Sequence, residues 1–265
     1  MTEPTVNVFR YPEQDGALYI EFDNQASMNS FTPGMWHTLV STLRDARKDD
    51  TVRAVILTGA GERAFSSGLS MDFLEMMETD DDRSVFYTLG VEVREAIFLL
   101  GKPIIAAVKG LCVGGGFEIS LCCDLIYAAE GAKFLLPELN IGLTPGCGGA
   151  INLASKIPLN RAFEMILFSE RITAEEAKRL GLVNQIFPAD TFDEELAKIV
   201  DKILSKPPLA VRGLKEILSH TAVTPDEGEA LKAERRLAID LMCTEDFKEA
   251  VTAFQEKRKP VFKGK

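Results

Sequence analysis

The stretch from Lys102 to Gly149 constrains the fold most, because it joins a buried strand to a glycine-rich helix start. Ile104–Val108 is a short apolar run of the kind that a buried strand makes. Gly114–Gly116 comes a few residues later and leads into Phe117–Leu121, which predicts the start of a buried helix. Glycines at this point leave no Cβ in the way of a ligand that approaches the backbone.

Two glutamates accompany these glycines. Glu118 falls in the first turn of the predicted helix, and Glu138 follows in an apolar segment of its own. Free N–H groups at a helix start favour developing negative charge, and apolar surroundings raise a carboxyl pKa towards neutrality. The residues therefore suit acid–base chemistry beside an oxyanion hole. The same residues also suit close backbone packing with two exposed or paired glutamates, and spacing alone favours this second interpretation.

A resemblance to a known family changes that balance. Gly110–Leu125 resembles the signature of the crotonase superfamily, the enoyl-CoA hydratase/isomerase family, and Ala64–Leu69 resembles its other core segment. The match continues through Lys133–Gly149, Ala174–Val183 and Lys257–Lys263. It covers nearly the whole chain in order, and the two core motifs are more specific to the family than to one reaction.

The resemblance implies an α/β fold, a crotonase-like spiral of strand–strand–helix units with a helical C-terminal region. Residues 1–187 would form the spiral core with the active site, and residues 188–265 a helical region for oligomerisation. Relatives form trimers or dimers of trimers, so the expected assembly is a homotrimer or homohexamer. The residues themselves show only the alternation of strands and helices.

The individual elements follow from local patterns. Thr32-Pro33 predicts a helix start with a threonine cap and proline at the first position. Apolar spacing predicts the remaining elements, which are strands at Val6–Tyr11, Ala17–Phe22, Val52–Thr58 and Val183–Phe187, and helices at Met71–Glu78, Arg83–Leu100, Asn160–Phe168, Thr173–Leu180, Thr191–Leu204, Pro208–His220, Asp226–Met242 and Glu245–Lys257.

The resemblance also assigns catalytic roles. It implies that the backbone N–H groups of Leu69 and Gly115 are the two oxyanion donors. It implies that Glu118 positions and activates water, and that Glu138 supplies the α-proton. Family double-bond isomerases keep an acid at the position of Glu138 and not at that of Glu118, so the presence of both favours a hydratase.

Substrate contacts are expected near the same two loops and at the C-terminal tail. The resemblance implies substrate-binding positions at Ser67, Leu69, Ser70, Met71, Gly115, Phe262 and Lys263. Of these, Phe262 and Lys263 would serve a neighbouring subunit's coenzyme pocket. The family often has Asp where this chain has Ser70, so substrate preference does not carry over. Met71–Glu78 is either a wall of the acyl pocket or a core face.

The leading hypothesis is an enoyl-CoA hydratase, a carbon–oxygen lyase that adds water across the conjugated double bond of an enoyl-CoA thioester. The alternatives are an enoyl-CoA or dienoyl-CoA isomerase, or a hydratase of a cyclic dienoyl-CoA. No metal or redox cofactor is expected, because coenzyme A is part of the substrate. The expected partner is therefore an acyl-CoA, with no nucleic acid and no membrane.

Composition supports these exclusions. The 265-residue chain has a net charge of −10, whereas phosphate binding needs a basic face. An RNA-binding relative is disfavoured, since Arg44–Lys48 has three basic residues with an aspartate among them. The longest apolar run is too short to span a bilayer, and Met1–Pro4 does not resemble a secretion signal. Five cysteines without a CxxC motif predict reduced thiols and a cytoplasmic location.

Other catalytic motifs do not fit. The glycine spacing at Gly114–Gly116 differs from that of a dinucleotide-binding turn, and no Walker sequence is present. Ser66 and Ser67 are not part of a G-x-S-x-G pattern. The two histidines, His37 and His220, lie outside the family motifs and are interpreted as surface or packing residues.

Overall fold

The structure is a computed structural model that describes residues 3–70, 73, 79–223 and 240–265. The predicted helix Met71–Glu78 lies outside the described residues apart from Phe73. Most of the predicted helix Asp226–Met242 also lies outside them.

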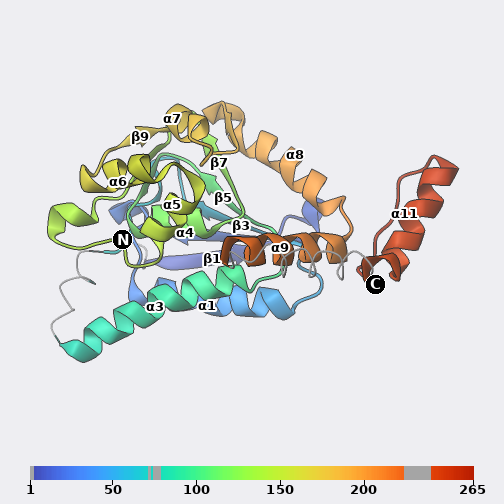
Figure 1. Cartoon of the computed structure of the whole chain (residues 1–265), viewed down its shortest axis with the longest axis horizontal. Helices are drawn as coiled ribbons and strands as arrows, with labels where there is room; N and C mark the ends of the chain where they lie inside the picture. The colour runs from blue at the N-terminus through green and yellow to red at the C-terminus, as the bar shows by residue number, and fades with distance from the viewer. Residues whose placement is uncertain (1–2, 71–72, 74–78, 224–239) are drawn as a thin grey trace.

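A six-stranded sheet forms the centre of the molecule (Figure 1). Its first two strands are antiparallel, and every later neighbour pairs in parallel. In spatial order the strands are β1 (Thr5–Phe9), β2 (Ala17–Asp23), β3 (Ala54–Gly59), β5 (Ile104–Val108), β7 (Leu125–Ala129) and β10 (Gln185–Phe187). The parallel pairing of β2 with β3 makes the predicted strand–helix–strand unit a crossover, as expected for an α/β fold.

Both faces of this sheet are buried, because successive side chains of a strand point to opposite sides. In β5, Ile104 packs into the larger core cluster while the next residue, Ile105, packs into a second cluster on the other face. Helix α1 (Pro33–Lys48) contributes to the larger cluster, and α8 (Phe192–Leu204) covers the other face. Two-sided burial explains why β5 is a continuous apolar run.

A second, smaller sheet lies beside the first, and its strands are two or three residues long. Its strands in order are β4 (Ala64–Ser66), β6 (Leu111–Val113), β8 (Lys133–Leu135) and β9 (Ile172–Thr173). Each of the first three directly follows a strand of the large sheet, so strand pairs β3–β4, β5–β6 and β7–β8 repeat around the molecule. This repeat is the spiral architecture expected from the resemblance.

The long helices begin where sequence signals indicate. The Thr32 hydroxyl accepts a hydrogen bond from the Met35 N–H at 3.3 Å, which confirms the predicted cap of α1. Helix α3 (Asp80–Phe98) starts three residues earlier than the prediction at Arg83. The backbone of Asp80–Asp82 therefore belongs to the helix rather than to a break before it.

The structure describes ten further helices. They are η1 (Pro12–Gln14), η2 (Gln25–Ser27), α4 (Gly115–Cys122), η3 (Glu138–Ile141), α5 (Gly149–Lys156), α6 (Leu159–Leu167), α7 (Ala174–Arg179), η4 (Ala189–Thr191), α9 (Pro208–Val223) and α11 (Glu245–Glu256). Among the described residues, no helix has a stretch long and apolar enough to cross a membrane.

The C-terminal tail folds back along α11, which stands apart from the two sheets (Figure 1). Asp246 is 3% exposed, and its carboxylate accepts hydrogen bonds from the N–H groups of Lys263 and Gly264 at 2.7 and 3.0 Å. The N–H of Asp246 donates to the Lys265 carbonyl. A second carboxylate, Glu249, accepts from the Val261 N–H and pairs with Arg258. The tail is therefore held mainly by its backbone N–H groups.

We expect Asp246→Ala to release the tail, because it removes the acceptor of two N–H groups. Hydrogen exchange at the amides of residues 263 and 264 should approach the rate of unprotected amides. The control is Asp240→Ala, a change at an exposed aspartate before α11. Unchanged protection at residues 263 and 264 in the Asp246 variant would show that the carboxylate does not hold the tail.

Candidate active site

Three predicted site residues follow neighbouring strands of the small sheet. Leu69, Gly115 and Glu138 come shortly after the ends of β4, β6 and β8. These strands are parallel and adjacent, so their carboxyl ends meet at one edge of the sheet. In open α/β sheets, ligands bind outside the carboxyl ends of the strands. The topology therefore brings the three residues together from distant parts of the chain.

The N–H of Leu69 is left free by a short parallel bridge to Phe31. The Phe31 N–H donates to the Gly68 carbonyl at 2.7 Å, and the Ser70 N–H donates to the Phe31 carbonyl at 3.0 Å. These two bonds fix the peptides on either side of Leu69 and turn its own N–H to the opposite side. No described residue accepts a hydrogen bond from that N–H.

The second donor is the N–H of Gly115 at the first position of α4, for which the described part of the chain offers no acceptor. A helix leaves its first N–H groups without a partner inside the helix. A Cβ placed on Gly68, where φ is +90°, would lie 3.0 Å from the Gly115 nitrogen. The two loops are thus in contact, and a side chain at position 68 would separate them. The backbone of Gly68, next to Leu69, therefore lies against the backbone of Gly115, so the two predicted donors belong to segments in contact.

Glu118 is held by two backbone donors, which we call the Glu118 clamp. Its Oε1 accepts hydrogen bonds from the N–H groups of Cys147 and Gly149 at 2.8 and 2.9 Å. The residue is 3% exposed, and burial raises the pKa of Glu118 while these hydrogen bonds act in the opposite direction. A Cβ on Gly149 would lie 2.6 Å from the Glu118 Cγ, so the clamp requires glycine there.

Glu138 has a different environment. It lies in η3, and its Oε1 is 3.3 Å from the point where a Cβ on Gly114 would lie. Its Oε2 is buried, with no hydrogen-bond partner among the described residues. Burial is the main cause that raises the pKa of Glu138 to about 7, and the charge of Glu118 raises it further. The site thus pairs a clamped carboxyl group with one that has an unpartnered oxygen and titrates near neutrality.

The remaining predicted binding residues have other observable roles. Ser67 ties the segment after β4 to η2, because its hydroxyl donates to the Ser27 carbonyl at 2.9 Å. The Ser70 hydroxyl accepts from the Phe73 N–H at 3.2 Å. Met71 lies outside the described residues. Within one chain the tail with Phe262 and Lys263 is far from α4 (Figure 1), so their service to a neighbouring subunit stays a prediction.

Sequence reasoning missed the residues that hold this machinery in place. Cys147 and Gly149 lie in a turn-rich run, and nothing in the run itself shows that its N–H groups bind Glu118. Phe31 has no motif around it, although it brackets Leu69. Only the approach of segments distant in the chain reveals these contacts. Among the described residues, no three His, Cys, Asp or Glu side chains are grouped to hold a metal ion.

Comparison with known proteins places the chain in a family. The family model described as enoyl-CoA hydratase/isomerase matches residues 12–265. The chain belongs to this family. It is thereby a member of the crotonase superfamily, as the two core motifs predicted.

Individual relatives are similar along almost their whole length. A short-chain-enoyl-CoA hydratase of Clostridium acetobutylicum is 35% identical over 248 residues, which are 93% of this chain and 94% of the relative. A 2,3-dehydroadipyl-CoA hydratase of Escherichia coli is 33% identical over 252 residues, 95% of this chain and 97% of the relative. The crystal structure of an enoyl-CoA hydratase from Bacillus anthracis superposes with a TM-score of 0.93 at 34% identity, covering 98% and 99% of the two chains. The spiral fold is therefore confirmed.

The environment of Glu138 predicts a pH-dependent cost in stability. Its pKa rises from 4.5 to about 7 on folding, so the native state holds more protons than the unfolded state between these values. The free energy of unfolding must then fall as pH rises through this window. Glu138→Gln removes the titrating carboxyl group and, with it, this loss of free energy of unfolding. The variant should therefore gain stability relative to the wild type as pH rises from 5 to 8. Urea denaturation in steps of ~0.5 pH measures the difference.

The matched control is Glu130→Gln, a change at an exposed glutamate. Its stability difference from the wild type should not grow over the same pH range. A Glu138→Gln difference that is constant with pH would contradict the raised pKa.

Proposed function

We propose that this protein adds water across the conjugated double bond of an enoyl-CoA thioester. The observation that carries the proposal is that two N–H groups without an acceptor among the described residues, those of Leu69 and Gly115, occur together with the buried Glu118 and the half-buried Glu138. Hydration of a conjugated thioester needs these functions, which are an oxyanion hole, a base for water and an acid for the α-carbon.

The thioester carbonyl would accept hydrogen bonds from the Leu69 and Gly115 N–H groups. This withdraws electrons from the double bond and makes the β-carbon electrophilic. As the water oxygen bonds to the β-carbon, negative charge moves to the carbonyl oxygen and is stabilised by the two donors. Glu118 takes a proton from the water, and Glu138 gives a proton to the α-carbon. The net change is the addition of one water molecule, after which proton exchange resets the two glutamates.

The surroundings of the two carboxyl groups support this division of work. The two clamp N–H groups stabilise the charged form of Glu118, as a base for water requires. Glu138 has a pKa of about 7, so a large fraction carries a proton near neutral pH and can act as an acid. Its unpartnered Oε2 leaves one oxygen available for proton transfer.

Coenzyme A would be bound as part of the substrate, and the acid–base chemistry requires no metal or redox cofactor. Ser67, Leu69 and Ser70 belong to the loop that would lie against the thioester, and Met71 follows them in the sequence. The relatives named above are hydratases of enoyl-CoA or dehydroadipyl-CoA, which supports hydration as the reaction. Their names differ in the acyl group, so the acyl chain of this protein's substrate is a matter for a substrate screen.

We also propose a homo-oligomer, a trimer or a dimer of trimers. Several large apolar side chains on η3, α5 and α6 face solvent in the single chain, among them Ile151, Leu159, Phe163 and Phe168, which are 65–73% exposed. Apolar patches of this kind mark interaction sites in soluble proteins. A cytoplasmic location is supported by the five free cysteines.

The substrate screen tests the reaction. Purified protein is incubated with crotonyl-CoA, longer trans-2-enoyl-CoAs, 3-enoyl-CoAs and cyclic dienoyl-CoAs. We expect loss of the conjugated chromophore and a mass gain of one water for at least one conjugated substrate. Glu138→Gln should lower that turnover at least ~100-fold, the usual size of an acid–base contribution, with the fold intact by circular dichroism.

Each other outcome has a definite meaning. Isomerisation of a 3-enoyl-CoA without hydration would favour the isomerase and leave Glu118 as a structural carboxylate. Tight acyl-CoA binding without turnover would overturn hydration in favour of another acyl-CoA chemistry. Near-normal turnover by Glu138→Gln would remove Glu138 from the mechanism.

Light scattering tests the assembly. The wild-type protein should have a mass of three or six chains at micromolar concentration. Phe163→Glu places a charge on the apolar surface of α6 and should lower the mass, because a buried unpaired charge destabilises an interface. A monomeric wild type would contradict the oligomer and, with it, the role of Phe262 towards a neighbouring subunit.

A further inference from the structure

We infer that Trp36 is a positioning residue, which fixes the two oxyanion donors relative to the Glu118 clamp. This role rests on the proposed function and goes beyond it, because Trp36 lies outside both family motifs. It is 1% exposed in α1, and it is the sole tryptophan of the chain. The indole joins three parts of the site, each through an observed contact.

The first contact is with the Gly115 donor. The outer edge of the indole ring lies 3.8 Å from the point where a Cβ on Gly115 would stand. The Cα of Gly68 lies at the same distance on another side. The ring therefore lies beside the first residue of α4, next to the loop that carries the other proposed donor.

The second contact reaches Leu69 through Phe31. The rings of Phe31 and Trp36 meet edge to face, with centroids 5.2 Å apart and an interplanar angle of 90°. Phe31 is fully buried, and its backbone makes the two bonds that bracket Leu69. A shift of the indole would move Phe31 and with it the direction of the Leu69 N–H.

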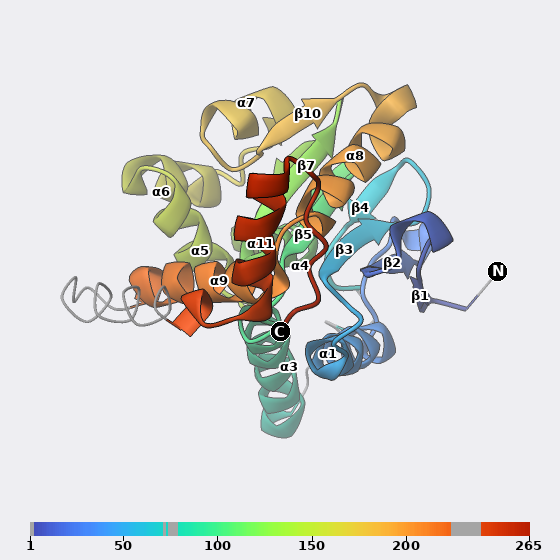
Figure 2. The ribbon, with the colours of Figure 1, turned by 90° about the vertical axis from the view of Figure 1, so that its right-hand side faces the viewer.

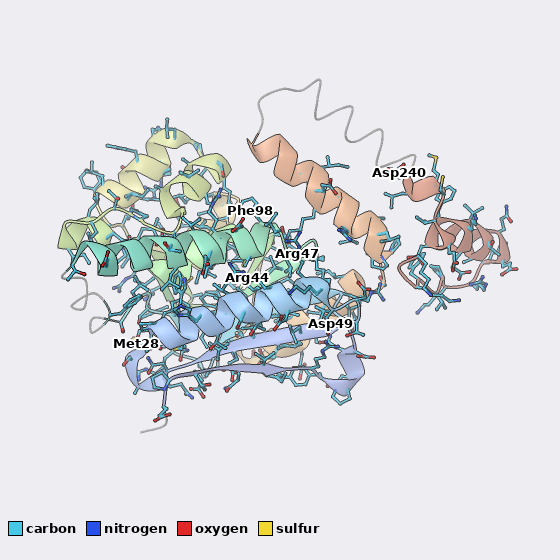
Figure 3. All side chains as sticks on the ribbon, turned by 90° about the horizontal axis from the view of Figure 1, so that it is seen from below. Met28, Arg44, Arg47, Asp49, Phe98 and Asp240 are labelled. Atoms are coloured by element: carbon cyan, nitrogen blue, oxygen red, sulfur yellow. The ribbon has the colours of Figure 1, made fainter. Side chains whose placement is uncertain are left out.

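The third contact ties the indole to α3. The Trp36 Nε1–H donates to the Leu89 carbonyl at 2.7 Å in a buried hydrogen bond. Helices α1 and α3 run side by side, as Figure 3 shows from below and Figure 2 from the side. The next residue of α3 is Gly90, where a Cβ would lie 3.0 Å from the Cys147 Sγ and 3.3 Å from the Gly146 carbonyl oxygen.

This third contact leads directly to the clamp. Gly90 packs on the turn whose Cys147 N–H holds Glu118. The indole hydrogen bond thus fixes the position of α3 relative to that turn. The indole ring fixes the positions of the two proposed oxyanion donors. Misplacement of catalytic groups by ~1 Å can cost ~100-fold in rate, even when the altered residue is remote from the chemistry. A substitution of Trp36 should therefore lower kcat, although the indole does not contact the reacting atoms.

Trp36→Phe tests the role, because it shortens the ring and removes the indole N–H. We expect kcat for the best substrate of the screen to fall at least ~10-fold. The affinity for free coenzyme A, which has no thioester carbonyl, should stay within about twofold of the wild type, since coenzyme binding does not need the donors. The control is Phe192→Leu, which also removes part of a buried aromatic side chain, but from the core on the far face of the large sheet. This variant should keep the wild-type kcat.

A pair of glycine variants separates positioning from stability. Gly90→Ala pushes a methyl group against the clamp turn, whereas Gly34→Ala in α1 meets its nearest atom at 3.9 Å. Alanine favours the helix at both positions. We expect Gly90→Ala to keep or raise Tm while kcat falls at least ~5-fold, and Gly34→Ala to keep kcat. A role confined to stability would not produce this division.

Trp36 fluorescence provides a direct readout. Butyryl-CoA is a saturated thioester that can occupy the oxyanion hole without reacting. We expect it to change the wild-type emission more than free coenzyme A does at equal saturation. Equal emission changes, or wild-type kcat in both Trp36→Phe and Gly90→Ala, would overturn the inference. If the wild type hydrates no substrate, the proposed function itself fails, which is a separate result.

Discussion

The parallel pairing of β6 between β4 and β8 is the constraint on which the site depends. Each of these strands is three residues long, and the chain that leaves each one delivers a functional group. Because the strands are neighbours, Leu69, Gly115 and Glu138 arrive at one edge from segments far apart in the sequence. The large sheet with its two-sided core supplies the stability that such short strands lack.

Burial is the physical source of both the chemistry and its cost. Removing Glu118 and Glu138 from water raises both pKa values. Two N–H groups of a neighbouring turn bind Glu118 and act against this rise, whereas the hydrogen bond that lowers the pKa of Glu138 comes from its own backbone. Glu138 is left with an unpartnered oxygen among the described residues. A fold that optimised stability alone would pair or replace that carboxyl group. The imbalance between the two glutamates therefore indicates function more strongly than their presence does.

Much of this arrangement is predictable from the sequence, and the limits have physical causes. Ile104–Val108, the Thr32 cap and the buried stripe of α3 were predictable, because a continuous apolar run, a capping residue and 3.6-residue spacing are local signals. The two- and three-residue strands of the small sheet are too short for periodicity to register. The family motifs singled out both glutamates and both proposed donors. They could not reveal Trp36 or the clamp, whose contacts exist only after distant segments meet.

The two proposed oxyanion donors are backbone groups, and this has a consequence for how such a protein can change. A substitution at position 69 changes the side chain beside the proposed substrate pocket but leaves the backbone N–H in place. At position 68 the backbone conformation and the contact with Gly115 exclude any side chain. Position 69 therefore tolerates substitution, whereas position 68 does not. New acyl specificities can accumulate at position 69 while the electrophilic machinery is inherited unchanged.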